Sequence, residues 1–159
     1  MFNTKEEGRM RPYLLLMAAL GLLLGAAPSQ DADKDLKRMQ GTWRIAEREY
    51  EGKTMKDEGG KLPEMILATT GNKYVIRVGK KEFDRGTLKV DSGKKPKEMD
   101  VLSETGPLKG KVLRGIYELK EDTMRACFGP ADGDRPSEFD TKKGKGRVMV
   151  WYEREKKEK

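Results

Sequence analysis

Apolar and polar residues alternate along most of the chain, and turn-forming residues interrupt this alternation every 8 to 12 residues or so. In one such segment Tyr74, Ile76 and Val78 share a face, while Arg77 lies on the other. A repeat of two residues is typical of a β-strand that is buried on one face. The pattern predicts eight strands, at residues 42–50, 64–69, 73–78, 82–90, 98–103, 111–119, 123–128 and 147–154.

These strands predict an all-β fold. The connections between them are short and no long helical repeat is present, so consecutive strands are expected to pair in antiparallel fashion. Closing the strands into a barrel hides the two edges that an open sheet exposes. We therefore predict an eight-stranded antiparallel up-and-down barrel, with a two-layer β-sandwich as the structural alternative.

A short helix is predicted ahead of the first strand, at residues 31–40. This segment is polar apart from Leu36 and Met39, which are spaced three apart as on one face of a helix. Asp31 and Asp33 are the candidate N-cap residues, because a carboxylate there accepts hydrogen bonds from free backbone N–H groups. We expect this N-terminal helix to close one end of the barrel.

The N-terminal region has the pattern of a secretory signal peptide. Lys5, Arg9 and Arg11 precede an uninterrupted apolar stretch at residues 13–27. As a helix this stretch would span about 22 Å, less than the ~30 Å hydrocarbon core of a bilayer. We predict cleavage after Ser29 and an exported protein, periplasmic or extracellular; an uncleaved N-terminal anchor is the alternative.

Removal of residues 1–29 leaves residues 30–159, a length typical of one domain. We predict a single β-barrel domain with a charged C-terminal tail at residues 153–159.

The chain has 34 Lys and Arg residues against 27 Asp and Glu residues, and a formal net charge of +7. The two signs are interspersed, as on a solvated surface, so nucleic-acid binding is not expected. No Cys follows the apolar stretch, and we expect a monomer with neither a lipid anchor nor a stable membrane span after cleavage.

The composition excludes several kinds of chemistry. The chain has no histidine, which removes Ser-His-Asp and Cys-His catalysis and His-ligated zinc. Cys127 is the single cysteine, so there is no internal disulfide, and its apolar neighbours predict a buried packing residue and not a nucleophile. No glycine-rich phosphate loop is present. We therefore expect no enzymatic activity, no metal and no cofactor.

Carboxylates are the remaining candidate chemistry, and they gather at residues 129–146, which is predicted to be a loop because it contains two Pro and four Gly residues. The loop acids are Asp132, Asp134, Glu138 and Asp140. Such a group can supply an acid and a base, or oxygen ligands for calcium, but Asp beside Gly is ordinary in solvated turns, and that interpretation is favoured. In the same loop Arg135 and Glu138 are expected to pin the loop to the barrel through an Arg–carboxylate pair, with Phe139 as an apolar plug.

Several motifs resemble known proteins. The first strand begins with Gly41-Thr42-Trp43, a Gly-x-Trp start that resembles lipocalins and fatty-acid-binding barrels. The downstream runs are Thr87-Leu88-Lys89-Val90-Asp91, Lys95-Pro96-Lys97, Asp100, Lys109-Gly110-Lys111, Gly115-Ile116-Tyr117-Glu118-Leu119, Asp122-Thr123, Cys127 and Arg135-Pro136-Ser137-Glu138-Phe139. Together they resemble an uncharacterised exported domain family that is abundant in planctomycete bacteria, over residues 35–154.

The resemblance implies an exported location and a lipocalin-like barrel, and it implies no particular reaction. The Thr-Asp-Tyr motif that lipocalins carry in their second loop has no counterpart in this chain. By analogy with the conserved arginine of lipocalins, Arg154 is expected to lie over the ring of Trp43, in a cation–π contact worth about 0.5 to 2 kcal/mol.

Aromatic and methionine side chains on the expected inner faces indicate binding of a small apolar or amphipathic ligand. The candidate ligand-binding residues are Trp43, Tyr74, Tyr117, Phe128, Tyr152 and Arg154. Tyr152 and Arg154 share a face and can hold a ligand carboxylate. The same side chains can also fill an eight-stranded barrel, and a filled core is favoured over a cavity. The functional alternatives are a non-catalytic cell-envelope interaction or structural module and, least favoured, a carboxylate-based hydrolase.

Overall fold

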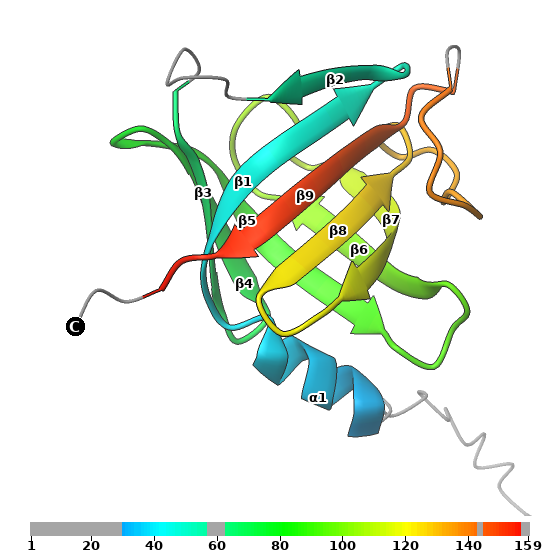
Figure 1. Ribbon diagram of the computed structural model, residues 1–159, viewed down its shortest axis with the longest axis horizontal. Coiled ribbons are helices and arrows are strands. Elements are labelled where there is room, and N and C mark those ends of the chain that lie inside the picture. Colours follow the sequence, from blue (N-terminus) through cyan, green and yellow to red (C-terminus); the bar gives the residue numbers. More distant parts are fainter. Residues whose placement is uncertain (1–29, 57–62, 143–144, 157–159) are drawn as a thin grey trace, which may run out of the picture.

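A closed antiparallel β-barrel makes up most of the computed structural model, which describes residues 30–56, 63–142 and 145–156 (Figure 1). Its elements are α1 (Gln30–Arg38), β1 (Gly41–Tyr50), β2 (Lys53–Lys56), β3 (Met65–Thr70), β4 (Lys73–Val78), β5 (Lys81–Asp91), β6 (Lys97–Ser103), β7 (Val112–Leu119), β8 (Thr123–Phe128) and β9 (Val148–Arg154). The predicted signal peptide, residues 1–29, lies outside the described residues. In the described ranges no helix has the length and apolar character needed to cross a membrane.

Eight strands, β1 and β3 to β9, form the barrel wall, and each pairs with its neighbours in antiparallel fashion. The wall closes because β1 also pairs with β9, from Trp43 opposite Arg154 to Tyr50 opposite Val148. This closure removes the sheet edges that a sandwich would keep. The predicted eight-stranded up-and-down barrel is therefore confirmed, and the sandwich alternative is wrong.

The bounds of these eight strands agree with the predicted ones to within one residue at each end, but β2 is an extra strand that was not predicted. Glu51 and Gly52 have φ values of 49° and 73°, as in a type I′ hairpin turn, and they direct β2 back along residues 47–50 of β1. All four residues of β2 are exposed. The strand has no buried apolar face, so the alternation of apolar and polar residues could not predict it.

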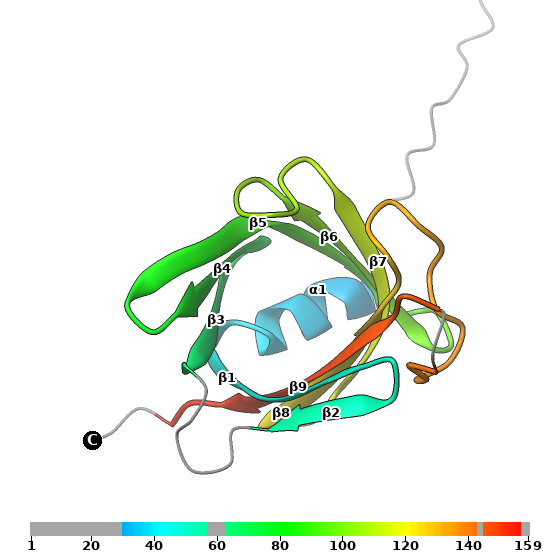
Figure 2. The same ribbon diagram turned by 90° about the horizontal axis from the view of Figure 1, so that it is seen from above.

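The predicted helix is present as α1 and lies across one end of the barrel, which we call the α1 end (Figure 2). Leu36 and Met39 pack against the barrel core, so the helix closes this end as expected. The prediction of its start is wrong, because the helix begins at Gln30 and therefore includes both Asp31 and Asp33. The opposite, open end carries the connections at residues 79–80, 104–111 and 129–147.

The barrel core is built from the inward-facing residues of every wall strand, together with Met39. Trp43 and Tyr117 are both 0% exposed. A bulge between Ile45 and Glu47 shifts the register of β1 against β9, so the alternation of this strand changes phase halfway along it.

A second, smaller apolar cluster lies on the outer face of the barrel. Ile116, Cys127 and Met149 are buried there, and Phe139 and Trp151 pack against them. Phe139 comes from the long loop between β8 and β9, so it covers the outside of the wall and does not plug the mouth of the barrel. The predicted packing role of Cys127 is confirmed by its complete burial, and this burial raises the pKa of the thiol.

Candidate functional site

The α1 end of the barrel is held by Trp43 and Arg154. The Arg154 guanidinium carbon lies 4.1 Å from the centre of the Trp43 ring, which confirms the predicted stacking. Arg154 also donates hydrogen bonds to the carbonyl oxygens of Gln40 (2.8 Å) and Arg38 (2.6 Å), and Trp43 Nε1 donates to the carbonyl oxygen of Met39 (2.8 Å). The Arg154 guanidinium therefore uses its N–H donors on backbone carbonyl oxygens at and just after the end of α1. It is not free to hold a ligand carboxylate together with Tyr152, which is the role that the sequence predicted.

A buried carboxylate joins α1 to the barrel wall at the same end. Asp35, whose side chain is 5% exposed, accepts hydrogen bonds from Lys97 Nζ (2.6 Å) and Tyr117 Oη (2.9 Å) and forms an ion pair with Arg38. Burial alone would raise the pKa of Asp35, but the bonds from Lys97 and Tyr117 outweigh it and the pKa is lowered. Burial and the bond to Asp35 raise the pKa of Tyr117, so its phenol stays protonated and donates.

A cavity of about 100 Å³ remains inside the barrel. Its wall comes from Met39 and from seven of the eight wall strands, and the lining residues are Met39, Leu67, Thr69, Tyr74, Ile76, Asp84, Leu88, Met99, Val101, Leu113, Met124, Phe128 and Tyr152. This volume is below the 300–1,000 Å³ or so of typical drug-sized pockets, and nearer to an engineered cavity of about 150 Å³ that holds benzene. The interior is therefore mostly filled, as the sequence favoured, yet it retains space for a very small guest.

Of the six predicted ligand-binding residues, Tyr74, Phe128 and Tyr152 line this cavity. Trp43, Tyr117 and Arg154 lie instead at the α1 end, where each makes the contacts described above. The structure thus divides the predicted set into three residues beside the cavity and three that hold the helix against the barrel.

Asp84 is the one charged residue in the cavity wall. Tyr74 Oη donates to Asp84 Oδ2 (2.7 Å), and Ser103 Oγ lies 2.7 Å from Asp84 Oδ1. Thr105 Oγ1 is a more distant neighbour of the same oxygen, at 3.4 Å. Burial and the bond to Asp84 raise the pKa of the Tyr74 phenol, which therefore stays protonated. All three neighbours are hydroxyl groups, and Asp84 forms no ion pair with any residue that the structure describes.

Two glycines let aromatic rings lie flat against the inner wall. A Cβ atom at Gly86 would stand 1.9 Å from the carbonyl oxygen of Leu102 and 3.0 Å from the Tyr74 ring. A Cβ atom at Gly115 would stand 2.5 Å from the ring of Phe128. Glycine inside a strand often marks such a close approach. Here Gly86 allows the Tyr74 ring to pass over the backbone of β5 and its hydroxyl to reach Asp84.

Two further hydroxyl groups line the cavity without a hydrogen-bond partner among the described residues. Tyr152 is 7% exposed, and burial is the one cause that raises the pKa of its phenol. Thr69 is 4% exposed and lines the same space from β3. Buried polar groups in proteins are normally hydrogen-bonded, so these two hydroxyls offer unused donors and acceptors to a guest.

Comparisons of the chain with protein-family models, with curated proteins and with solved structures found no match. The resemblance to an exported planctomycete family therefore stays a prediction. The architecture, a closed eight-stranded antiparallel barrel with one helix across its end, is consistent with a lipocalin-like shape.

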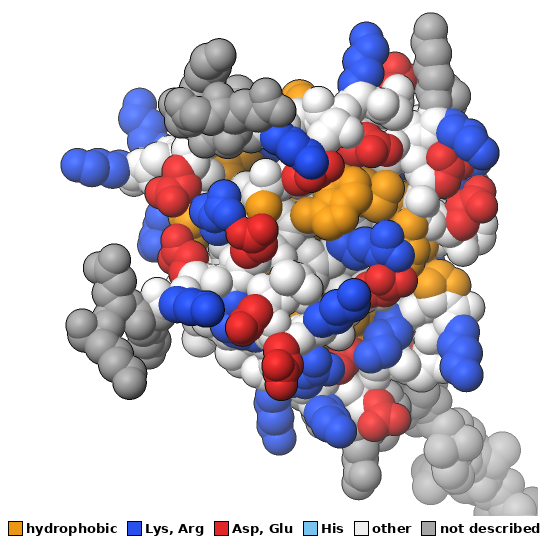
Figure 3. Space-filling view, viewed as in Figure 1, with side chains coloured by type: hydrophobic (Ala, Val, Ile, Leu, Met, Phe, Trp, Pro, Cys, Tyr) orange, Lys and Arg blue, Asp and Glu red, His pale blue; other side chains and the backbone are white. Residues whose placement is uncertain are grey.

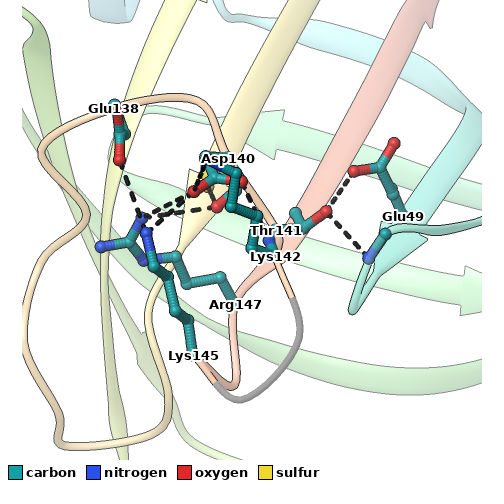
Figure 4. Close-up of polar contacts among 9 residues, drawn as sticks. Glu49, Glu138, Asp140, Thr141, Lys142, Lys145 and Arg147 are labelled. Atoms are coloured by element: carbon teal, nitrogen blue, oxygen red, sulfur yellow. Dashed lines mark hydrogen bonds and ion pairs between the residues drawn. The ribbon is translucent and has the colours of Figure 1, made fainter.

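The acidic residues of the long loop are tied mainly to cations. Asp140 lies among Lys142, Lys145 and Arg147, with its closest contact to Lys145 Nζ at 2.9 Å (Figure 4). Glu138 also pairs with Lys145. Thr141, beside them, donates to Glu49 on β1 and anchors the loop there. The bond from Lys145 lowers the pKa of Asp140.

The other two loop acids lie apart from this group. Asp132 pairs with Lys111 at 2.7 Å and accepts the backbone N–H of Val112, while Asp134 has no ion pair or hydrogen bond with the described residues. Nowhere in the described ranges do three or more Asp, Glu or Cys side chains come together as metal ligands would. Asp132, Glu138 and Asp140 thus serve contacts within the fold.

Arg135 pins the long loop to the barrel, as predicted, although with partners other than Glu138. It donates to the carbonyl oxygens of Met99 (3.0 Å) and Gly115 (2.7 Å) and pairs with Asp100 (2.7 Å) and Glu98 (3.3 Å). One side chain therefore bridges β6 and β7.

The outer surface of the barrel also has hollows, of which two are much larger than the interior cavity. One, of about 380 Å³, runs over β7, β8 and β9 beside Trp151 and is crossed by the ion pair of Arg125 with Glu118. Figure 3 shows this face, where basic and acidic side chains alternate around a hydrophobic patch. The other, of about 200 Å³, lies where β1 passes from β3 to β2, beside Met55 and Met65. Both belong to the outer surface, whereas the interior cavity is lined by Met39 and by inward-facing residues of seven wall strands.

Sequence reasoning missed Asp84. It lies in the predicted strand at residues 82–90, in phase with the inward-facing Leu88 and Val90. An acidic residue on the apolar face of a strand is the signal that identifies it, because an inward charge needs partners that only a site or a network supplies.

Proposed function

We propose that this protein is an exported, non-catalytic barrel that binds a small, mainly apolar ligand in its interior. The observation that carries the proposal is the cavity of about 100 Å³ in a barrel whose interior is otherwise filled by side chains. Three of its lining residues are methionines, Met39, Met99 and Met124, whose unbranched side chains adjust readily to the shape of a guest. The volume favours ligands far smaller than a fatty acid.

Export rests on the N-terminal pattern of Lys5, Arg9 and Arg11 followed by the apolar stretch at residues 13–27. A non-catalytic role rests on the absence of histidine and on the ion pairs that occupy Asp132, Glu138 and Asp140. Export is tested by sizing the protein from the periplasm and the medium, and an uncleaved cytoplasmic product would contradict it.

Ligand binding is tested with a variant that fills the cavity. Val101 lines the cavity from β6, and Val101→Phe should weaken the binding of benzene at least tenfold, because the added ring takes up the space. Val75 lies next to the inward-facing Tyr74 and points outward, so Val75→Phe is the matched control and should leave binding unchanged. Binding is measured by shifts in backbone amide NMR signals and in the melting temperature. No saturable response in the unmodified protein, or equal responses in both variants, would contradict the proposal.

A second candidate function, the non-catalytic interaction module, is favoured by one observation. Among the described residues, five large apolar side chains are 37–47% exposed, and all lie on strands or loops near the open end: Tyr50, Met55, Phe83, Leu102 and Leu108. Exposed apolar side chains gathered at one end are a feature of partner surfaces. If this function holds, Phe83→Ser with Leu108→Ser should abolish recovery of a specific envelope partner and leave benzene binding intact.

A further inference from the structure

The cavity lining is mostly apolar, but polar residues follow one another on the adjacent strands β3, β4 and β5. Thr69 of β3 is paired with Tyr74 of β4 in the sheet register, and Tyr74 is paired with Gly86 of β5. Asp84 lies two residues before Gly86 on β5 and faces the same way. Tyr152 of β9 contributes a further hydroxyl group to the lining.

No described residue supplies a counter-ion to the Asp84 carboxylate. The buried Asp35 shows the usual arrangement, because Lys97 and Arg38 stand against it. In the part of the chain that the structure describes, the hydrogen-bond partners of the Asp84 carboxylate are all hydroxyl groups, from Tyr74, Ser103 and Thr105. Ser103 has one proton, which it shares between Asp84 and the carbonyl oxygen of Thr105. An ionised carboxylate has about four acceptor positions, so Asp84 has capacity for a further donor.

Two more acceptors line the same cavity. Thr69 and Tyr152, which are 4% and 7% exposed as whole residues, have hydroxyl groups without a hydrogen-bond partner among the described residues. A primary ammonium group has three N–H donors and no acceptor, which matches a wall that has a negative charge and free hydroxyl oxygens. A ligand carboxylate would meet the charge of Asp84 instead, and a purely apolar ligand would leave these groups unsatisfied.

We propose that the ligand of this cavity is a small aliphatic amine, bound as its ammonium ion with the charged nitrogen against Asp84 and the carbon chain among the methionine and leucine side chains. This proposal rests on the proposed function, because it assigns the chemical class of the ligand at the same site. A chain of about four carbons suits a volume of about 100 Å³. Pairing of the ammonium group with the Asp84 carboxylate makes the site selective for amines over alcohols and acids of equal length.

The test compares three probes of nearly equal size: n-butylammonium, 1-butanol and butyrate. Each is titrated into the full-length protein at pH 7, and Kd is measured from backbone amide NMR shifts. We expect n-butylammonium to bind at least tenfold more tightly than 1-butanol, and butyrate to bind more weakly than either. This comparison needs no variant, so it holds even if a substitution prevents folding.

Two variants then assign the selectivity to Asp84. Asp84→Asn should bring the Kd ratio of 1-butanol to n-butylammonium close to one, because the charge is lost while the side chain keeps its shape. Asp134→Asn, the same change at an exposed loop residue, should leave the ratio as it is. Circular dichroism and the melting temperature verify that both variants fold.

The outcomes separate this inference from the proposed function. If 1-butanol binds in the cavity and n-butylammonium binds no more tightly, the amine assignment is overturned and interior ligand binding stands. If neither binds up to its solubility limit, and benzene does not bind either, both are overturned. A tenfold selectivity that persists in Asp84→Asn would show that another group recognises the amine.

Discussion

Single residues decide what the interior of this barrel can accommodate. Gly86 allows the ring of Tyr74 to cross β5, and the phenol then reaches Asp84 at 2.7 Å. A methyl group at position 86 would meet the backbone oxygen of Leu102 at 1.9 Å, and backbone in a paired strand does not move aside at low cost. One glycine thus makes room for the polar side of the cavity.

A pH-dependent contribution to stability follows from Asp35. Its pKa is lowered in the folded protein, so the stabilisation is fully present above the unfolded pKa of about 3.9 and is lost as the pH falls through the folded pKa. At pH 7 we expect Asp35→Asn to lower the free energy of unfolding by about 1–3 kcal/mol, because Lys97 and Tyr117 lose a charged acceptor. Urea unfolding between pH 7 and pH 2 should show this difference shrinking below about pH 4.

The matched control for this prediction is Asp134→Asn, an exposed acid without a partner in the described ranges. It should leave the curve of stability against pH unchanged within about 0.5 kcal/mol. A difference between the unmodified protein and Asp35→Asn that stays constant down to pH 2 would contradict the assignment to an ionised Asp35.

At the scale of elements, the connection between β8 and β9 is the segment that least resembles a simple turn. It covers the outer cluster with Phe139, whose ring stacks under the Arg125 guanidinium at 4.2 Å. It is also fastened to β1 through Thr141 and to β6 and β7 through Arg135. This long loop is therefore attached to four wall strands, β1 and β6 to β8, and we expect these contacts to stabilise the fold.

The attachment of the long loop depends most on Arg135, whose side chain is 22% exposed. Because hydrogen bonds to charged groups contribute about 1.5–3 kcal/mol each, Arg135→Ala should lower the free energy of unfolding by about 2–3 kcal/mol. It should also make the chain more sensitive to trypsin after Lys142 and Lys145, since the loop loses its attachment to β6 and β7. Urea unfolding measures the first effect and mass spectrometry of digests the second.

Asp134→Ala, next to Arg135 in the chain but without a side-chain partner in the described ranges, is the control and should change neither quantity. If Arg135→Ala digests at the same rate as this control, Arg135 does not hold the loop.

For the whole molecule, stability comes from closure and packing and not from covalent links. With a single cysteine the chain forms no internal disulfide, and the pairing of β1 with β9 leaves the wall without a free edge. β2 adds a short exposed strand beside β1. The molecule should therefore unfold cooperatively, with a midpoint that does not change when a reductant is added.

The rate at which the Cys127 thiol is chemically labelled measures this cooperativity. Its side chain is completely buried, and burial raises the pKa of the thiol, so both access and thiolate formation are suppressed in the folded protein. A disulfide reagent such as DTNB should label Cys127 at the rate at which whole molecules unfold, as measured by stopped-flow dilution into urea. Labelling well above that rate would show that the long loop opens separately from the barrel.

The strands, their bounds and their closure into a barrel were predictable from the sequence, because alternation and turn residues such as Gly71 and Gly79 act locally. The exposed strand β2 was not, since it lacks an apolar face. The meeting of Asp84 with Tyr74 and Ser103 depends on the register of three strands. The small remaining cavity depends on the summed volumes of side chains from nearly every strand. Such sums over distant segments have no local signature, so the cavity and its polar lining form only when the barrel is closed.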